Sequence, residues 1–299
     1  PVELGTGAFA MDTGNSSSTQ SFTSGFPVDF ALVKLTSSSG NWDATGRLIQ
    51  GKYLRTNTTD SEGTWADYKF DQQDGFGTDS GFTSSTQSWM WKRGQGFDCI
   101  CYKGNGSNTG DTQSISHGLN QIPEMAWVKK RSASDDWIVY NKDLHSSIPE
   151  KYYLELNDTT ARTYQDQIFD IPTSTHFNLR HTSTVNQNNQ DFIMILFSSV
   201  SGISKVGSFS GSNSSQTIST GFAPRFVIIR RVDSTENWFV FDTVRGWAAG
   251  NDQRLRLNRD SAQNNGTDYG APTSTGFSLT GNVGGTNTSG GEYIYYCHS

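Results

Sequence analysis

The chain has few of the residues that most often build crosslinked or metal-bound sites. Its 299 residues include only three cysteines, five histidines and seven prolines. Such an odd and sparse set of cysteines excludes a disulfide framework, and no Cys/His spacing matches a zinc site. Cys99 and Cys101 lie two apart on a predicted strand, so their side chains share one face. Together with Cys297 they are expected to be buried or half-buried thiols.

Charge and long apolar runs are also scarce. Charged residues make up 17% of the chain and hydrophobic residues 33%, both low for a globular domain. The net charge is −6, and the sequence has no basic stripe that could neutralise phosphates, so nucleic acid is excluded as a partner. The longest apolar run, residues 192–197, is far too short to span a bilayer, so no membrane insertion is expected.

The sequence contains no motif of a familiar catalytic centre, neither a nucleophile elbow nor a phosphate loop nor a zinc-protease helix. Asp135 and Asp136 precede Trp137 in a predicted turn, with calcium binding as the alternative interpretation. Acidic residues do not recur at matching positions, whereas a glycan depolymerase needs two carboxylates across a groove. We therefore expect no enzyme activity, no cofactor and no required metal.

What the chain does contain is uncharged polar residues and aromatic residues. Aromatic side chains reach 12%, with eight tryptophans, and the glycines number 31. Large aromatic side chains bury much apolar area each, so the chain should fold although few of its residues are hydrophobic. A polar but weakly charged surface is typical of extracellular or virion-exposed β proteins.

Three segments of the chain repeat one pattern. Each segment contains a glycine. A glutamine stands five residues before this glycine, and an apolar residue stands three residues before it. A strand follows and ends in a basic residue, and a tryptophan stands eight residues further on. The glycines are Gly25, Gly118 and Gly221, and the tryptophans are Trp42, Trp137 and Trp238. This register is too regular for chance, and it predicts three copies of one module.

Later landmarks in each copy agree with this register. Alternating strands end at Asn57, Asn157 and Asn258, and each copy then has a phenylalanine, namely Phe82 after Gly81, Phe177 and Phe277. Aromatic or apolar strands over 89–91, 192–197 and 293–296 close the copies. No 3.6-residue period persists, and short strands alternate with Gly/Asn/Ser turns.

These patterns are typical of a β-sandwich or barrel, and we predict an all-β fold of three tandem antiparallel β-sandwich modules. The modules are expected over residues 1–106, 107–208 and 209–299, arranged like beads along an axis. Because modules of this size have thin cores, each tryptophan is expected to fill the core of its own module. A sugar-stacking platform is the alternative role. The repeat glycines and phenylalanines complete the set of structural anchors.

Residues 89–91 and 293–296 are expected to leave aromatic surface uncovered on each module. A homotrimer with its modules stacked along a threefold axis would bury the same patch three times and close. The sequence thus favours self-association.

Segments 118–131, 221–230 and 238–246, with 255–258 and 291–296, resemble repeats in bacteriophage tail fibres and related virion proteins, particularly of marine and cyanobacterial phages. The resemblance covers nearly the whole chain. The first copy departs from it, because no strand is expected after Trp42. The second copy has residues 140–143 in place of an Asp-Thr-Val-Arg-Gly segment.

This resemblance implies lectin-like or jelly-roll-like sandwiches, although fold analogy does not establish sugar binding. It further implies a non-enzymatic structural protein of a tail fibre or another virion appendage, exposed on the virion and contributing to host attachment. The implied partners are copies of itself, other virion proteins and a host-surface glycan or protein. The alternatives are a capsid decoration or adaptor protein, a cellular lectin-like adhesin and a glycan-depolymerase tailspike.

Overall fold

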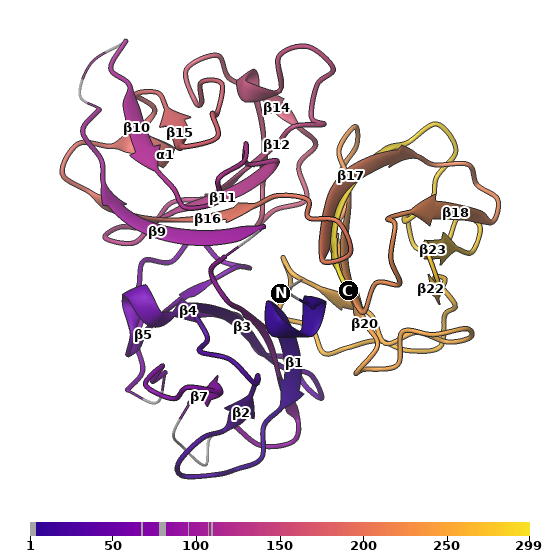
Figure 1. Ribbon diagram of the computed structural model, residues 1–299. Coiled ribbons are helices and arrows are strands. Elements are labelled where there is room, and N and C mark those ends of the chain that lie inside the picture. The colour runs from indigo at the N-terminus through magenta and orange to yellow at the C-terminus, as the bar shows by residue number, and fades with distance from the viewer. Residues whose placement is uncertain (1–3, 67, 78–81, 95, 107, 109) are drawn as a thin grey trace.

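The computed structural model describes residues 4–66, 68–77, 82–94, 96–106, 108 and 110–299 (Figure 1). In this part of the chain the helices are short: one α-helix, α1 (Ser183–Asn186), and the 3-10 turns η1 (Gly5–Gly7), η2 (Arg47–Ile49) and η3 (Pro149–Lys151). All sheets are antiparallel, so the predicted all-β class is confirmed.

Three large sheets share one strand order. The first is β1 (Phe9–Thr13), β8 (Thr86–Trp91), β3 (Phe30–Leu35), β4 (Trp42–Gly46), β5 (Lys52–Arg55) and β6 (Gly63–Thr64). The second is β9 (Phe97–Lys103), β16 (Asp191–Phe197), β11 (Met125–Lys130), β12 (Trp137–Asn141), β13 (Tyr152–Glu155) and β14 (Thr163–Tyr164). The third is β17 (Ser204–Ser210), β24 (Glu292–His298), β19 (Phe226–Arg231), β20 (Trp238–Asp242) and β21 (Leu255–Arg256).

A small sheet accompanies each large one. The small sheets are β2 (Phe22–Thr23) with β7 (Gly75–Phe76), then β10 (Gln113–Ser116) with β15 (His176–Leu179), then β18 (Gln216–Ser219), β23 (Gly276–Leu279) and β22 (Pro272–Thr273). We call the parts of the chain that contain these sheet pairs unit 1 (residues 4–94), unit 2 (96–198) and unit 3 (199–299).

The large sheets are buried on both faces. In β11, Met125 and Trp127 belong to one apolar cluster, whereas Ala126 and Val128 belong to another. The first cluster, which we call the central core, contains residues of all three units. The second is the outer core of unit 2, beneath its small sheet, and units 1 and 3 have outer cores of their own. Side chains alternate between the two faces because successive residues of a strand point in opposite directions.

The three units lie around a common centre, with the large sheets facing inward and the small sheets outside (Figure 1). The expectation of beads along an axis is therefore wrong. Its physical reason is that one face of every large sheet is apolar and needs a cover, which the other two units provide.

The expected divisions near residues 106 and 208 also need correction. Strand β9 pairs with β16 over its whole length, and β17 pairs with β24. The divisions therefore fall between β8 and β9 and between β16 and β17, near residues 95 and 199. The Gly/Asn/Ser segments after these two strands are turns within a unit, because the strand before each of them already belongs to the following sheet.

Two further expectations are overturned. Trp42–Gly46 is a strand, β4, although its Ala-Thr-Gly sequence is a weak strand former, because β3 and β5 pair with it on both sides. The aromatic surface expected at 89–91 and 293–296 is covered within the chain. Trp91 and Tyr296 lie in the central core, where the indole Nε1 donates to the tyrosine Oη at 3.2 Å.

Candidate functional site

The three repeat tryptophans link neighbouring units. Their side chains are at most 1% exposed and belong to the central core. Each indole Nε1 donates to a backbone carbonyl of a neighbouring unit. The pairs are Trp42 to Arg256 at 2.9 Å, Trp137 to Arg55 at 2.8 Å and Trp238 to Glu155 at 3.0 Å. They form a closed cycle, so these residues do not fill the cores of their own modules. Buried indoles also present no face to a sugar, which removes the stacking-platform alternative for these three.

The basic residue before each tryptophan repeats this cycle. Each side chain is buried and donates to a loop carbonyl of the same neighbouring unit that accepts the indole. The pairs are Lys34 to Asp260 at 3.2 Å, Lys129 to Thr59 at 2.9 Å and Arg230 to Thr160 at 2.6 Å. Burial lowers the pKa of both Lys34 and Lys129 to about 8 and that of Arg230 to about 10, because desolvation disfavours the charged forms.

The strand-end asparagines hold the acceptor loops in place. In each unit the asparagine Oδ1 accepts the backbone N–H of the tryptophan of its own unit. The distances are 2.9 Å for Asn57 and Trp42, 2.7 Å for Asn157 and Trp137, and 3.0 Å for Asn258 and Trp238. We call the basic residue, tryptophan and asparagine of one unit its clasp. The repeated polar side chains of the clasps thus bind backbone groups.

The repeat glycines differ in conformation. Gly25 and Gly221 have φ of +80° and +88°, the left-handed region that favours glycine. Gly118 is outside this region, and its N–H donates to Asp98 Oδ2 at 2.7 Å. The shared sequence position therefore has two structural explanations.

The phenylalanines also require one correction. Phe177 and Phe277 lie opposite Ile115 and Ile218, the apolar residues three before the repeat glycines. In unit 1 the residue at that position, Phe22, pairs with Phe76. Phe76 is therefore the counterpart, not Phe82, which is buried elsewhere in the outer core of unit 1. Gly81 lies outside the described residues. Two Gly-Phe pairs follow Asn57 in the sequence, and only strand pairing distinguishes them.

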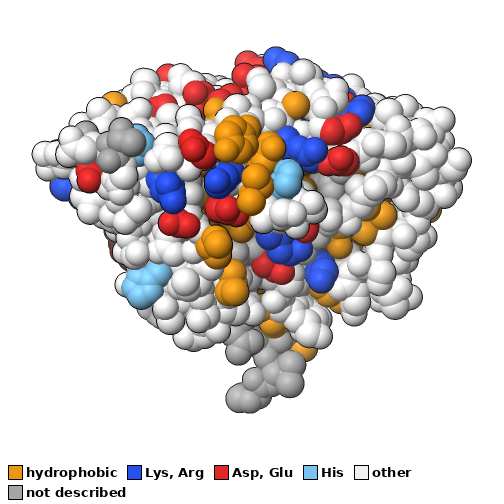
Figure 2. All heavy atoms as spheres, turned by 90° about the horizontal axis from the view of Figure 1, so that it is seen from above, with side chains coloured by type: hydrophobic (Ala, Val, Ile, Leu, Met, Phe, Trp, Pro, Cys, Tyr) orange, Lys and Arg blue, Asp and Glu red, His pale blue; other side chains and the backbone are white. Residues whose placement is uncertain are grey.

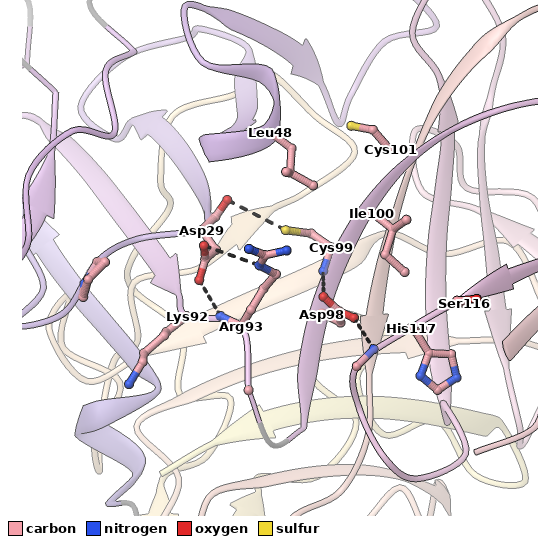
Figure 3. Close-up of a pocket in the computed structure, with 13 residues that line it drawn as sticks. Asp29, Leu48, Lys92, Arg93, Asp98, Cys99, Ile100, Cys101, Ser116 and His117 are labelled. Carbon is pink, nitrogen blue, oxygen red and sulfur yellow. Dashed lines mark hydrogen bonds and ion pairs between the residues drawn. The ribbon is translucent and has the colours of Figure 1, made fainter. Parts of the chain in front are cut away.

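An open cleft of about 740 Å³ lies between units 1 and 2 (Figure 3). Asp29 and Arg93 lie on the wall from unit 1, and Asp98 and Cys99 on the wall from unit 2. Asp29 accepts the Arg93 N–H at 2.7 Å, and Asp98 accepts the N–H groups of Cys99 and Gly118. Both carboxylates therefore bind backbone N–H groups.

The reactive residue types in this cleft are not arranged for nucleophilic chemistry. Burial raises the pKa of both the Cys99 and Cys101 thiols, which keeps them protonated. His117, the histidine of the cleft, has Nε2 3.2 Å from the Thr173 carbonyl, and its Nδ1 accepts the Leu119 N–H. Ser116 Oγ instead lies 3.2 Å from Nε2 of His176 outside the lining, and the other nitrogen of that ring contacts Thr175 Oγ1 at 2.9 Å. In the described part of the chain no carboxylate therefore completes a catalytic triad around this histidine.

The carboxylates suggested as calcium ligands have protein partners. Asp135 forms an ion pair with Lys130, and Asp136 Oδ1 accepts the Asn157 amide at 2.8 Å. Within the described ranges, no three His, Cys, Asp or Glu side chains are grouped so as to hold a metal ion. No described helix has the length and apolar character needed to cross a membrane.

Sequence reasoning missed Trp65, because it lies outside the repeated pattern. This residue is 37% exposed and borders a hollow of about 220 Å³ in unit 1. Asp43 and Tyr68 line the same hollow, and the Tyr68 hydroxyl donates to Asp43 Oδ2 at 2.6 Å. The useful signal is that Trp65 lies beside the carboxylate of Asp43. This proximity arises only from strand pairing, so the sequence alone does not show it.

Figure 2 shows one face of the molecule, on which most atoms belong to uncharged polar side chains or backbone. Lys, Arg, Asp and Glu are interspersed there, and the hydrophobic side chains gather in small groups. This face carries no extended patch of one charge.

The fold and the clasps define a class of all-β protein in which three similar sheet units close around one core. The chain belongs to the family described as a domain of unknown function, DUF7483, whose model matches residues 8–299. The matched stretch includes all three large sheets. No curated protein matches the chain.

Proposed function

We propose that the chain is a non-enzymatic structural and recognition protein of a phage virion, built into a tail fibre or another appendage exposed on the particle. The observation that carries this proposal is the cycle of clasps. The basic, indole and amide groups that recur in the three units bind backbone groups of the scaffold. A rigid body of this kind suits a particle component that presents a binding surface outside the cell.

Because the repeated side chains bind the scaffold, attachment to a host surface would depend on residues that differ between the three units. Loops on the outside of a rigid scaffold commonly carry binding function. The weakly charged, polar surface fits contact with a glycan or a protein at the host surface. The aromatic segments that suggested a homotrimer pack inside one chain, so self-association rests on the resemblance to tail fibres alone.

Localisation in purified particles tests the proposal. Antibodies against the chain should label an appendage of purified virions in electron micrographs, and the chain should be found in those particles by mass spectrometry. Labelling of the capsid would favour a decoration or adaptor protein. Absence from particles together with presence on a cell envelope would contradict the proposal and favour a cellular adhesin.

The absence of catalysis is tested separately. Incubation of the pure protein with host-surface polysaccharide should release no oligosaccharides, with or without a chelator. Released oligosaccharides would support the depolymerase alternative.

A further inference from the structure

We propose that the hollow beside Trp65 in unit 1 binds one neutral sugar ring, and this inference rests on the proposed recognition role. The indole lies against Tyr68 and Phe82, with ring centroids 5.2 and 5.4 Å apart. The rest of the lining is polar at Asn41, Thr83 and Thr86 and apolar at Val33 and Leu35. The hollow thus combines a supported aromatic ring with hydrogen-bonding groups.

The other two units provide an internal comparison for this site. Asp43 pairs with Val33, and the equivalent residues of units 2 and 3, opposite Val128 and Ile229, are Ile138 and Phe239. Both of these are buried in the outer cores. Unit 1 therefore places a carboxylate where its sister units place apolar core residues. Burying a charge is unfavourable, so a polar residue at this one position points to a function of unit 1 alone.

Trp65 also differs from its counterpart in unit 2. The Trp65 backbone N–H donates to the Gly51 carbonyl. In unit 2 the equivalent backbone bond runs from the Gln165 N–H to the Lys151 carbonyl. The same backbone position thus holds a glutamine in unit 2. The backbone at this position therefore accepts residues other than tryptophan.

Asp43 can still accept a hydrogen bond from a ligand. Its Oδ2 accepts the Tyr68 hydroxyl, and its Oδ1 forms an ion pair with Arg55 across 3.8 Å, a separation beyond hydrogen-bonding distance. Burial raises the pKa of Asp43 to about 6, so the carboxyl is ionised at neutral pH and can accept hydroxyl groups there.

The shape and chemistry of the hollow select the ligand class. A volume of about 220 Å³ is below the roughly 300 Å³ at which sites for drug-sized ligands begin, so the hollow fits a single ring. A sugar has a C–H face that packs on an aromatic ring and an edge of hydroxyl groups for the polar atoms. The carboxylate disfavours acidic sugars.

Binding of the purified chain to a panel of neutral and acidic glycans, followed by calorimetric titration of the best neutral sugar, tests the site. Trp65→Gln introduces the residue that unit 2 has at this position, and should weaken binding at least tenfold. Because it also removes the ring that packs on Tyr68 and Phe82, a cooperative thermal transition is required of the variant before its affinity is compared. Asp43→Asn should weaken it severalfold. Tyr164→Gln, at an exposed aromatic residue of unit 2, is the matched control and should bind like the natural chain.

Failure to bind any neutral glycan at millimolar concentration, or undiminished affinity of Trp65→Gln, would overturn this assignment. The measurement uses the isolated protein, so it is independent of where the chain resides. A sugar-binding chain absent from virions would refute the proposed virion role but not the site. A virion protein that binds no neutral sugar would refute only the site.

Discussion

At the scale of single residues, departures from the repeat are more informative about function than the repeat itself. The repeated pattern within the chain places Trp42, Trp137 and Trp238 in one core, where they bind backbone groups. Asp43 breaks the pattern at a position that is apolar in the other units. The effect of Asp43 on stability and its effect on ligand binding can be measured separately.

Asp43→Asn should change how stability depends on pH. Burial raises the pKa of Asp43 from 3.8 to about 6, so between these values the folded chain binds more protons at this residue than the unfolded chain. The free energy of unfolding therefore falls as pH rises through this window. The asparagine does not titrate but still accepts from Tyr68. Relative to the natural chain, the variant should gain on the order of 2 kcal/mol between pH 3.5 and 7. Urea unfolding at both values measures this, and equal differences at both would contradict it.

At the scale of single elements, a glycine follows the first strand of each small sheet, but only two of these three turns require a glycine for their backbone conformation. Gly25 and Gly221 adopt positive φ, whereas Gly118 does not. A Cβ at Gly221 would meet no atom within 4 Å, and at Gly118 it would lie 3.4 Å from Asp98 Oδ2. Any cost at Gly221 is therefore conformational.

Gly221→Ala should lower the free energy of unfolding by about 1–2 kcal/mol, the cost of left-handed backbone for a residue with a Cβ. Gly118→Ala is the matched control and should change it by less than about 0.5 kcal/mol, since its position needs no special backbone. Chemical denaturation of the two variants measures both values. Equal losses at the two glycines would show that another constraint acts on this turn.

The clasp is the second element that a single substitution can test. In Trp137→Phe the Arg55 carbonyl loses its indole donor while the ring remains apolar. The carbonyl keeps the longer bond from the Thr58 backbone N–H, at 3.4 Å. The lost indole bond should therefore lower the free energy of unfolding by about 0.5–1.5 kcal/mol, in addition to a small loss of packing. Trp42→Phe and Trp238→Phe should give similar losses, because the three bonds are equivalent. A loss confined to one variant would mean that the cycle is not closed in solution.

The sequence predicts the strands, the repeat and the all-β class well, because alternation and turn residues are local properties. The sequence also indicates the central core. In residues 125–128 every side chain is apolar, a pattern typical of strands buried on both faces. The clasps could not be predicted from the sequence, because lysine is usually a surface residue. Lys34 and Lys129 donate to carbonyl groups of neighbouring units, and the sequence does not show which units are neighbours. The Trp65 hollow is lined by four segments, within residues 33–35, 41–43, 65–68 and 82–86, that only the folded chain brings together.

At the scale of the whole molecule, the central core predicts that the units depend on one another. It combines Trp127 and Trp137 of unit 2 with residues such as Trp89 of unit 1 and Tyr296 of unit 3. A unit cut out of the chain would expose one face of its large sheet. Exposed apolar faces of this kind favour aggregation rather than a stable monomer.

The intact chain should therefore unfold in one transition, with a ratio of calorimetric to van't Hoff enthalpy of about 1. A fragment of residues 96–198, which includes all of the second large sheet and its small sheet, should not show a cooperative transition on its own. Replacing Trp127 and Trp137 of the fragment with serine gives a control for solubility, since it removes the two largest apolar side chains from the exposed face. Independent beads would behave otherwise. The fragment would then unfold cooperatively, and the intact chain would give an enthalpy ratio well above 1, because each unit would melt by itself. Scanning calorimetry of both proteins distinguishes these outcomes.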